Sequence, residues 1–571
     1  MVDSSHAELP KSQQAKRPVP AAVPPLWRGW LALWGPFPLL NWLGMLGALR
    51  FRLLPLELRW LLGAALGLHL LSSLFTPHPQ AALILGSLRS LFIAGLVVTG
   101  WRLGRARQLL NLLPGLVAVL ITALIYTAMQ TGPGAGLPGR LLHPSYQYVS
   151  LGLAAALTLW LAVWWPGGRS SGPGWQTSGW QTLRWASGLL AALVLLLGGS
   201  RAPLAAALIG LALGGWCSGS VKDWGSVAAG VRRRWLLVAL ILGGGVTVLA
   251  LGVGRSAAPL TSGLLNGAAT HLTQLGLNGR DTYWEEAAGV FRALPLGGSG
   301  VGQLGNLVRS NQENCFQGWP TQGVGCPGWM LSLAARPWFA PARKLSWLAH
   351  NAALHSLAET GLIGTTALFL LLGLMVAAAL ASRSALLISV ITGYSVVSLF
   401  DNAATLPSLA VSEVFWLAGG VALREAYQVT GGAFRFFCLR RAAAWGAGLL
   451  LLTLVPVLLP ELLPASGPPP RLLALNVGTE AASAGSSTLF LGLGRLPVAG
   501  GGPLRLRLEL CTPICGVERV QDLTPDAGGE WWGAVGLPRL AATTTVRLQI
   551  LPPQGGLLGG RPLGEMVWRQ P

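Results

Sequence analysis

Charged side chains are scarce in this chain, in which 11% of the 571 residues are charged and 52% are hydrophobic. Soluble proteins carry about 25% charged residues, so this composition excludes an ordinary soluble domain. Acidic residues are the scarcest, at 20 against 40 basic ones. The net charge of +20 would suggest nucleic acid as a partner of a soluble protein, but the chain has no nucleic-acid-binding motif. We therefore expect arginines that anchor the cytoplasmic loops of a membrane protein.

Cysteine is also rare, and none of the six cysteines has the CxxC spacing that would indicate a zinc site. The glycine-rich run from Pro295 to Gly302 could be taken for a nucleotide-binding fingerprint, but no predicted strand precedes it. We expect this run to turn the chain closely over a ligand instead.

The sequence is dominated by long hydrophobic runs. The length of each run is close to the roughly 20 residues that a helix needs to cross a bilayer. Because backbone groups in lipid must be satisfied internally, helices are the expected spanning elements. Pro36 and Pro38 predict a break in the first run. The sequence predicts an all-α polytopic membrane protein with about 12–13 membrane helices. The runs lie near residues 30–49, 58–75, 80–100, 109–130, 146–166, 184–199, 202–217, 235–254, 361–381, 384–400, 408–424 and 443–464.

Arginine clusters set the expected orientation. Those near 50–59, 102–107, 232–234 and 435–441 fall on one side if the spans alternate, and the positive-inside rule makes that side cytoplasmic. We expect a multi-pass protein of the bacterial inner membrane with two large segments on the periplasmic side. The predicted order is a disordered cytoplasmic tail (1–28), N-terminal membrane helices (29–254), a large periplasmic loop (255–349), C-terminal membrane helices (350–464) and a small periplasmic β-rich domain (465–571).

The two large outer segments each hold a cysteine pair, Cys315 with Cys326 and Cys511 with Cys515. Both pairs lie on the predicted oxidising side, where disulfides persist, and are disulfide candidates. In the last segment, residues 504–510 alternate between apolar and charged side chains, and residues 543–551 are rich in β-branched residues. Both patterns predict strands.

His350 and Asn351 stand at the end of the large outer loop, with nine residues between Asn351 and the motif Gly361–Gly364. Histidine has an unperturbed pKa close to neutrality, which suits it to take a proton from a hydroxyl group. Arg201 lies between two apolar runs, and Arg280 opens an amphipathic segment in the outer loop. The planar guanidinium group matches phosphate oxygens in pairs. The alternatives to phosphate binding are that Arg201 snorkels to the membrane interface and that Arg280 pairs with a nearby acid.

Other polar residues of the predicted outer face are candidates for contact with a substrate. His355 and Glu359 are one helical turn apart and within reach of each other. Glu413 lies within a predicted span, where an acid indicates function or pairing with an arginine. The substrate-binding candidates are Asn351, His143, Tyr146, Trp284 and Asp401.

Taken together, the pattern resembles the superfamily of O-antigen ligases and Wzy polymerases over residues 80–424. The resemblance is carried by Ser200-Arg201, Gly279-Arg280 with Trp284, the Pro295–Gly302 turn, and His350-Asn351 with Gly361 and Gly364. It implies a metal-independent, inverting transferase of glycosyltransferase C type that needs no cofactor. The extra hydrophobic run at 443–464 and the β-rich segment depart from the plain layout of the family.

The resemblance also implies the substrates and roles. The donor would be a glycan on undecaprenyl diphosphate and the acceptor lipid A–core or another glycan, with membrane lipid around both. Arg201 and Arg280 would hold the diphosphate, and His350 would act as general base or orient the acceptor. A polysaccharide polymerase, a protein O-oligosaccharyltransferase and a membrane transporter, such as one for inorganic carbon, are the alternatives. A transporter would be expected to show inverted repeats, which the sequence lacks.

Overall fold

The protein is described by a computed structural model. The structure describes residues 25–34, 36, 38–130, 140–164, 178–218, 280–307, 348–402, 412–430, 434–462, 479–481, 486–493, 504–512, 514–523, 531–538, 545–551 and 564–569. The predicted run at 235–254 and the predicted disulfide partners Cys315 and Cys326 lie outside these residues.

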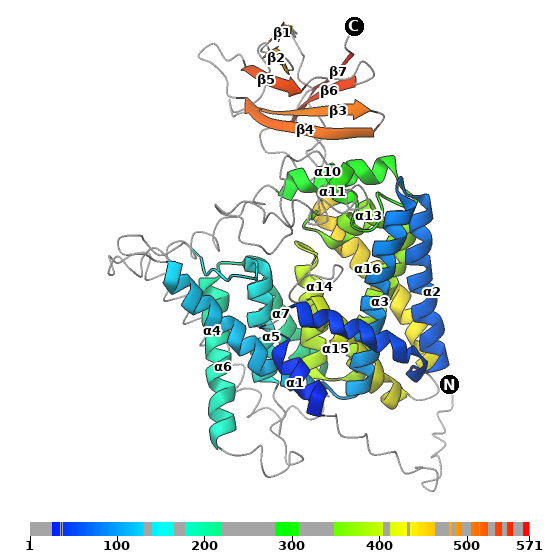
Figure 1. Cartoon of the computed structure of the whole chain (residues 1–571), viewed down its shortest axis with the longest axis vertical. Coiled ribbons are helices and arrows are strands. Elements are labelled where there is room, and N and C mark those ends of the chain that lie inside the picture. Colours follow the sequence, from blue (N-terminus) through cyan, green and yellow to red (C-terminus); the bar gives the residue numbers. More distant parts are fainter. Residues whose placement is uncertain are drawn as a thin grey trace, which may run out of the picture.

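The described chain is mostly helical, and its helices form one bundle (Figure 1). They are α1 (Pro25–Leu33), the 3-10 helix η2 (Pro38–Leu53), α2 (Leu56–Ser72), the 3-10 helix η3 (Ser73–Phe75), α3 (Pro79–Leu103), the 3-10 helix η4 (Ala106–Leu112), α4 (Leu113–Gln130), α5 (Tyr148–Val163), α6 (Ser178–Leu197), α7 (Arg201–Ser218), α10 (Arg280–Ala293), α11 (Leu304–Leu307), α13 (Ala352–Ser382), α14 (Ala385–Val397), α15 (Ser412–Thr430) and α16 (Phe434–Leu462). The break predicted at Pro36 and Pro38 falls between α1 and η2, as expected for proline.

Four of the described helical segments are long and apolar enough to cross a membrane: Leu56–Phe75, Pro79–Leu103, Ala106–Gln130 and Ala352–Ser382. Helices α5, α6, α7 and α14 are apolar over shorter stretches. Four is fewer than the 12–13 membrane helices predicted from the sequence, because several apolar runs form helices too short to qualify on their own. These four segments agree with a helical membrane protein.

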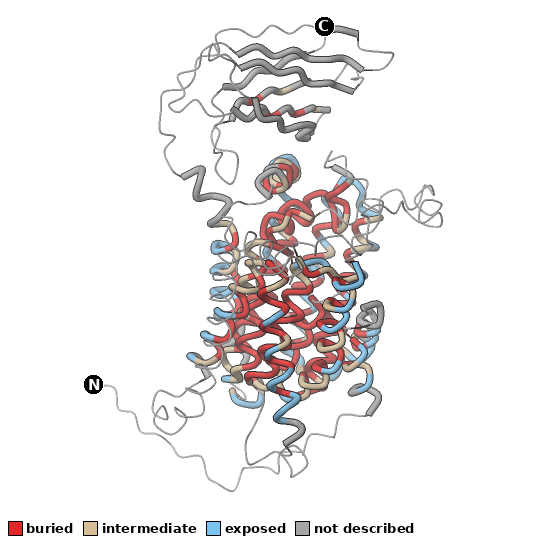
Figure 2. The backbone as a smooth tube through the Cα atoms, turned by 90° about the vertical axis from the view of Figure 1, so that its left-hand side faces the viewer, coloured by how far each residue is buried: buried red, intermediate tan, exposed pale blue. Residues whose placement is uncertain are grey.

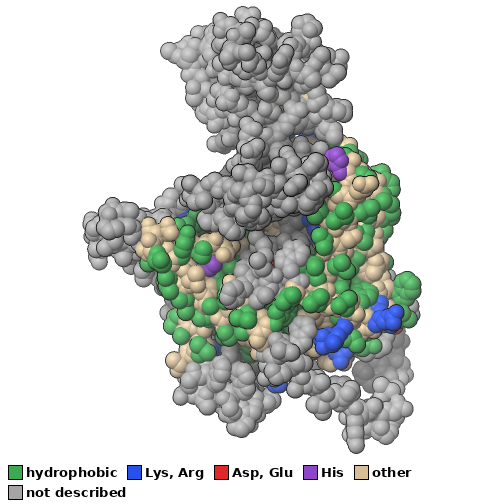
Figure 3. All heavy atoms as spheres, in the orientation of Figure 1, with side chains coloured by type: hydrophobic (Ala, Val, Ile, Leu, Met, Phe, Trp, Pro, Cys, Tyr) green, Lys and Arg blue, Asp and Glu red, His purple; other side chains and the backbone are tan. Residues whose placement is uncertain are grey.

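The bundle is apolar both inside and out. Buried residues fill its interior, and exposed ones lie on its outer surface (Figure 2). The exposed set includes large hydrophobic side chains such as Ile84, Ile125 and Leu189. A bundle that exposes such side chains suits lipid rather than water. Figure 3 shows this apolar surface, with the large patches of basic side chains gathered at the end of the bundle away from the strands.

Close backbone contact joins the long helices. At the crossing of α3 and α15, Gly100 and Gly420 lie where an added Cβ would overlap the backbone of the other helix. Small residues of this kind let membrane helices approach and gain dispersion contacts. This packing centres the bundle on α3, α13 and α15, which carry residues of the site described below.

Helix α13 is divided at Gly361, where the backbone leaves helical geometry with φ 58° and ψ −163°. Glycine alone adopts this region without large cost. The 31 residues of α13 would span about 46 Å as one straight helix, more than the roughly 30 Å of a bilayer core. The part of α13 after the break is close to the predicted run at 361–381.

After residue 478 the structure forms strands instead of helices. A three-stranded sheet has the order β1-β2-β5, and a four-stranded sheet has the order β4-β3-β6-β7. All of the pairings are antiparallel. The strands predicted at 504–510 and 543–551 correspond to β3 and β6. The strands are β1 (Thr479–Ala481), β2 (Ser486–Leu493), β3 (Leu504–Thr512), β4 (Ile514–Leu523), β5 (Trp531–Pro538), β6 (Thr545–Leu551) and β7 (Gly564–Arg569).

One predicted disulfide pair lies in these strands. Cys511 on β3 is disulfide-bonded. Cys515 on β4 is its cross-strand partner in the register. Cross-strand neighbours have the short Cβ separation that a disulfide needs. The position agrees with the prediction that these two cysteines pair with each other.

Candidate functional site

His350 lies just before α13 in a strained backbone conformation. Its φ of 50° is one of two positive φ values among the described residues other than glycine. A left-handed conformation costs a residue with a Cβ roughly 1–2 kcal/mol, so the surrounding structure must impose it. Such strain persists mainly at functional sites. This conformation singles out the residue that the sequence predicts as catalytic.

Three side chains surround His350. Its Nδ1 atom lies 3.5 Å from Oδ1 of Asp401, a distance longer than an ordinary hydrogen bond. The ring of Tyr283 stacks edge-on at 5.5 Å between centroids. The indole N–H of Trp284 donates to the backbone oxygen of His350 at 3.4 Å. The predicted residues Trp284, His350 and Asp401 are therefore neighbours, although they are far apart in the sequence.

Asn351 is the N-cap of α13, with its Oδ1 accepting from the backbone N–H of Leu354 at 3.0 Å. Asparagine is among the best N-cap residues. Its Nδ2 donates to the backbone oxygens of Leu399 at 2.9 Å and Thr453 at 3.0 Å. Asn351 is fully buried, so its polar atoms serve the helix start and the packing of α14 and α16. The described contacts of Asn351 are thus with the protein itself, and its contact with substrate stays a prediction.

The helix begins earlier than expected. The sequence places an apolar helix from Gly361, whereas α13 begins at Ala352. The cap at Asn351 explains the difference, because it satisfies a backbone donor that would otherwise be orphaned. His350 is thus one residue outside a helix N-terminus. It does not lie a turn or more before the helix.

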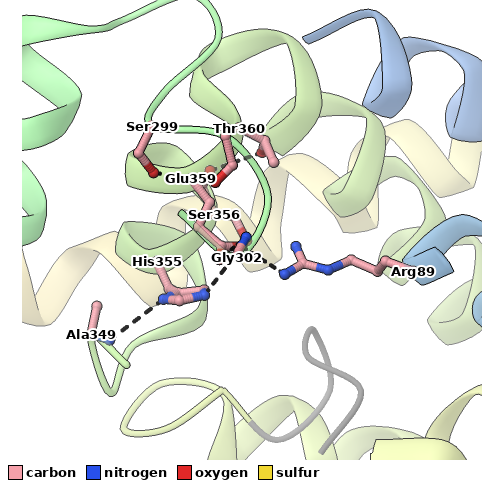
Figure 4. Close-up of polar contacts among 9 residues, drawn as sticks. Arg89, Ser299, Gly302, Ala349, His355, Ser356, Glu359 and Thr360 are labelled. Carbon is pink, nitrogen blue, oxygen red and sulfur yellow. Dashed lines mark hydrogen bonds and ion pairs between the residues drawn. The ribbon is translucent and has the colours of Figure 1, made fainter. Parts of the chain in front are cut away.

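A buried polar cluster lies one turn further into α13 (Figure 4). Glu359 Oε2 accepts from Nη2 of Arg89, which reaches over from α3, at 2.7 Å. The same oxygen lies 3.2 Å from Nε2 of His355. Glu359 Oε1 accepts from the backbone N–H of Gly302 at 2.8 Å. The predicted contact between His355 and Glu359 is therefore confirmed, as one part of a larger cluster.

The glycine-rich turn from Pro295 to Gly302 packs on this part of α13. The N–H of Ser299 donates to Ala358 O and that of Gly300 to Glu359 O, both at 2.8 Å. An added Cβ at Gly298, whose φ is 67°, would overlap these helix carbonyls. The N–H groups of the turn thus donate to carbonyl groups of α13. The expectation that the run turns over a ligand is corrected: it turns over the break in α13, whose freed carbonyls need donors.

Arg280 opens α10, the amphipathic helix that the sequence predicts after it. The side chain of Arg280 lies outside the described part of the structure. Helix α10 brings Tyr283 and Trp284 against His350. It therefore places the start of the predicted Arg280 motif close to the predicted base.

Arg201 begins α7 and is partly exposed. Arg140 is its electrostatic neighbour, and its guanidinium lies 5.1 Å from the centre of the Tyr148 ring. Partial burial, opposed by Tyr148 and reinforced by Arg201, lowers the pKa of Arg140. Two arginines so close repel each other unless an anion lies nearby. The anion contact expected of Arg201 stays a prediction.

His143 and Tyr146 contact each other, with ring centroids 4.8 Å apart. His143 Nδ1 accepts from the backbone N–H groups of Ser145 at 3.0 Å and Tyr146 at 3.2 Å. Burial lowers the pKa of His143 to about 4. Burial, with the nearby Glu413 carboxyl, raises the pKa of Tyr146 above its usual range. His143 thus shapes its own loop, and the buried Tyr146 has no exposed face for stacking on a sugar.

Glu413 is fully buried in the first turn of α15. The sequence left open whether it pairs with an arginine. Within the described residues, neither of its carboxylate oxygens has a hydrogen-bond partner. Its charge neighbours are Tyr146 and Tyr394. No pairing with an arginine is present in this part of the chain.

Arg89 is the residue of this region that the sequence interpretation missed. It lies in the run at 80–100, read as uniformly apolar, and is buried at 6% exposure. An arginine within a membrane span is a functional signal by default. The sequence therefore indicated a role for Arg89. Its acidic partner Glu359 is 270 positions away, so no local pattern could identify that partner.

In the described parts of the chain, no group of three or more His, Cys, Asp or Glu residues could hold a metal ion. The arrangement around His350 suits proton transfer. Asp401 faces one ring nitrogen, which leaves the other for a substrate hydroxyl. The sequence matches no protein-family model and no curated protein, so the function must be argued from these residues.

Proposed function

We propose that this chain is a membrane glycosyltransferase of the O-antigen ligase type. It would move a glycan from undecaprenyl diphosphate to lipid A–core. The observation that carries the proposal is the contact of 3.5 Å between His350 and Asp401, on a backbone held at positive φ. A histidine oriented by a carboxylate is the usual arrangement of a general base.

In the proposed reaction, Asp401 keeps the proton of His350 on Nδ1 and leaves Nε2 free to accept another. Nε2 takes the proton of the acceptor hydroxyl while that oxygen forms a bond to the anomeric carbon of the donor. The bond from that carbon to the phosphate oxygen breaks, and undecaprenyl diphosphate leaves with the electron pair. Direct displacement of this kind inverts the anomeric carbon. General-base catalysis contributes about 10²–10⁴-fold to such a step.

Arg201 and Arg280 would stabilise the charge that develops on the diphosphate. Fixed cations aimed at developing charge commonly supply the largest share of catalysis. The electrostatic proximity of Arg140 to Arg201 supports an anion at this place. Metal is not required, because a diphosphate is already a good leaving group and the arginines neutralise it.

The proposed location is the inner membrane of a bacterium, with the site on the periplasmic face. The basic patches at the opposite end of the bundle support this orientation through the positive-inside rule (Figure 3). The disulfide at Cys511 supports an oxidising compartment for the strands after residue 478. The strands would then lie on the same side of the membrane as the site.

The test is the lipopolysaccharide profile of a strain that lacks this protein. Core-only lipid, with long glycan accumulating on the carrier, is the result expected for a ligase. Core that carries a single repeat unit would identify a polymerase instead. An unchanged profile would contradict both and point to protein glycosylation or transport.

A transporter is the second candidate, and one observation favours it: Arg89, His355 and Glu359 are buried between apolar helices. Ionisable residues at such depth often mark transport pathways. Here Glu359 is already paired with Arg89 and bound by the Gly302 N–H, so its charge is neutralised internally. Uptake by vesicles that contain the purified protein would favour transport over transfer.

A further inference from the structure

The conformation of His350 must be imposed by its neighbours. One contact that constrains this part of the backbone comes from the buried cluster of Arg89, His355 and Glu359. The backbone N–H of Ala349, directly before His350, donates to Nδ1 of His355 at 3.5 Å. His355 is itself buried at 1% exposure. The ring therefore links the cluster to the backbone that sets the place of the proposed base.

The two nitrogens of His355 have separate tasks. Because Nδ1 accepts from Ala349, the proton of a neutral ring lies on Nε2. Nε2 faces Glu359 Oε2 at 3.2 Å, where a donor is needed. Figure 4 shows His355 between Ala349 and Glu359, with Arg89 approaching from α3. Arg89, Glu359, His355 and Ala349 thus form one continuous chain of contacts that ends beside His350.

We propose that Arg89, Glu359 and His355 are positioning residues that hold Ala349 and thereby fix the place of His350. This inference rests on the proposed function. None of the three residues touches substrate in it. The base lies outside the helix, where no helical hydrogen bond fixes it, so a contact from the buried cluster supplies the missing constraint. Displacement of a reacting group by about 1 Å can cost about 10²-fold in rate.

A merely structural role predicts something different. The pairing of Arg89 with Glu359 keeps two charges satisfied in an apolar interior. If that were the whole role, the contact of His355 with Glu359 would matter and its contact with Ala349 would not. The two nitrogens of His355 therefore allow the two roles to be separated.

The experiment compares His355→Asn with His355→Gln. The Asn side chain places Oδ1 near the position of Nδ1, and so keeps an acceptor for Ala349 while losing Glu359. The Gln side chain places its amide near the position of Nε2, and so keeps a donor for Glu359 while losing Ala349. In purified protein with undecaprenyl-diphosphate glycan and lipid A–core, His355→Gln should lower kcat by about 10²-fold with the donor KM unchanged. His355→Asn should keep more of the activity.

The matched control is Thr365→Val, which removes a buried hydroxyl that has no partner within the described residues and lies beyond the break in α13. It should leave kcat at the wild-type value. The positioning role is overturned if His355→Gln transfers as fast as wild type, or if His355→Asn is the slower of the two. A loss in Thr365→Val equal to that in His355→Gln would also overturn it.

Failure of the proposed function gives a different result, because wild type would then transfer no glycan. Hydrogen exchange at the Ala349 amide, measured in the same samples, tests the contact in that case. His355→Gln should speed this exchange, while His355→Asn and Thr365→Val should not. If the Ala349 amide stays as protected from exchange in His355→Gln as in wild type, the positioning role is contradicted whether or not the protein is a transferase.

Discussion

At the scale of single residues, His350 is both the proposed general base and a residue with a strained backbone. His350 is held at φ 50° by contacts before and after it, including those from His355 and Trp284. Its neighbour Asn351 is buried and satisfied by the helix it caps and by α14 and α16. The two residues of this pair therefore differ: Asn351 caps the helix and is buried, whereas the side chain of His350 is 26% exposed.

Replacing His350 with glycine should separate stability from activity. Glycine adopts positive φ readily, so His350→Gly should keep or raise the free energy of unfolding, by up to about 1 kcal/mol. The same variant should lose at least about 10²-fold in glycan transfer, because the general base is gone. Thermal unfolding in detergent and the transfer assay measure the two effects. A variant that is strongly destabilised, or that transfers at the wild-type rate, would contradict this account of His350.

His143 should make the stability of its loop depend on pH. Burial lowers its pKa from the ordinary value near 6.5 to about 4, so the folded state disfavours protonation. Between these values the unfolded chain binds more protons than the folded one, and stability therefore falls as pH drops from about 6.5 to about 4. Protonation also removes the Nδ1 acceptor used by Ser145 and Tyr146.

The variant His143→Asn tests this dependence, because asparagine offers a similarly placed oxygen that does not titrate. It should keep the loop and remove this contribution to the fall in stability between about pH 6.5 and pH 4. Thermal unfolding across that range measures it. An identical pH dependence in wild type and His143→Asn would show that another group is responsible.

At the scale of elements, the break in α13 organises the site. Helix α13 begins with the cap at Asn351, is interrupted at Gly361 and continues as the membrane-crossing part. Freed backbone groups at the break are satisfied by the Pro295–Gly302 turn. The turn thereby joins the outer loop to the helix that follows His350, which explains why a glycine run lies there.

Gly361→Ala should damage this arrangement. The backbone region at Gly361 is almost exclusive to glycine, and an added Cβ would overlap the carbonyl of Leu296. We expect a loss of about 3 kcal/mol or more in unfolding free energy, from strain and overpacking together. Gly448→Ala is the control, because nothing lies within 4 Å of a Cβ added there. Wild-type stability in Gly361→Ala would mean that the break is not needed.

At the scale of the whole molecule, the distribution of charge sets how the chain lies in a membrane. The bundle exposes large apolar side chains, carries its basic patches at one end and has the strands beyond the other (Figures 1 and 3). Positive charge favours the cytoplasmic side. The proposed site near His350 then faces the periplasm, where a lipid-linked glycan would be met.

Reporter fusions test this orientation. Alkaline phosphatase joined after residue 571 should be active, and green fluorescent protein joined there should not fluoresce, because the end of the chain is expected in the periplasm. A fluorescent fusion would place the strands in the cytoplasm. That result would also conflict with the disulfide at Cys511, since cytosolic thiols are kept reduced.

The class of the protein follows from the sequence alone. The backbone groups of long apolar runs can be satisfied in lipid only as helices, so the positions of these runs closely predict α2, α3 and the part of α13 after Gly361. Local chemistry also predicts the break at Pro36 and Pro38, the contact of His355 with Glu359 and the strands β3 and β6. Each of these depends on residues close together in the chain, where spacing determines geometry.

Tertiary structure decided the rest. The approach of Asp401 to His350, of Trp284 to the backbone of His350 and of Arg89 to Glu359 all join distant segments. Spacing along the chain carries no information about such approaches, because they depend on how whole helices pack. The role of the Pro295–Gly302 turn was mistaken for the same reason: its partner is a helix end more than fifty residues away, exposed only when α13 breaks.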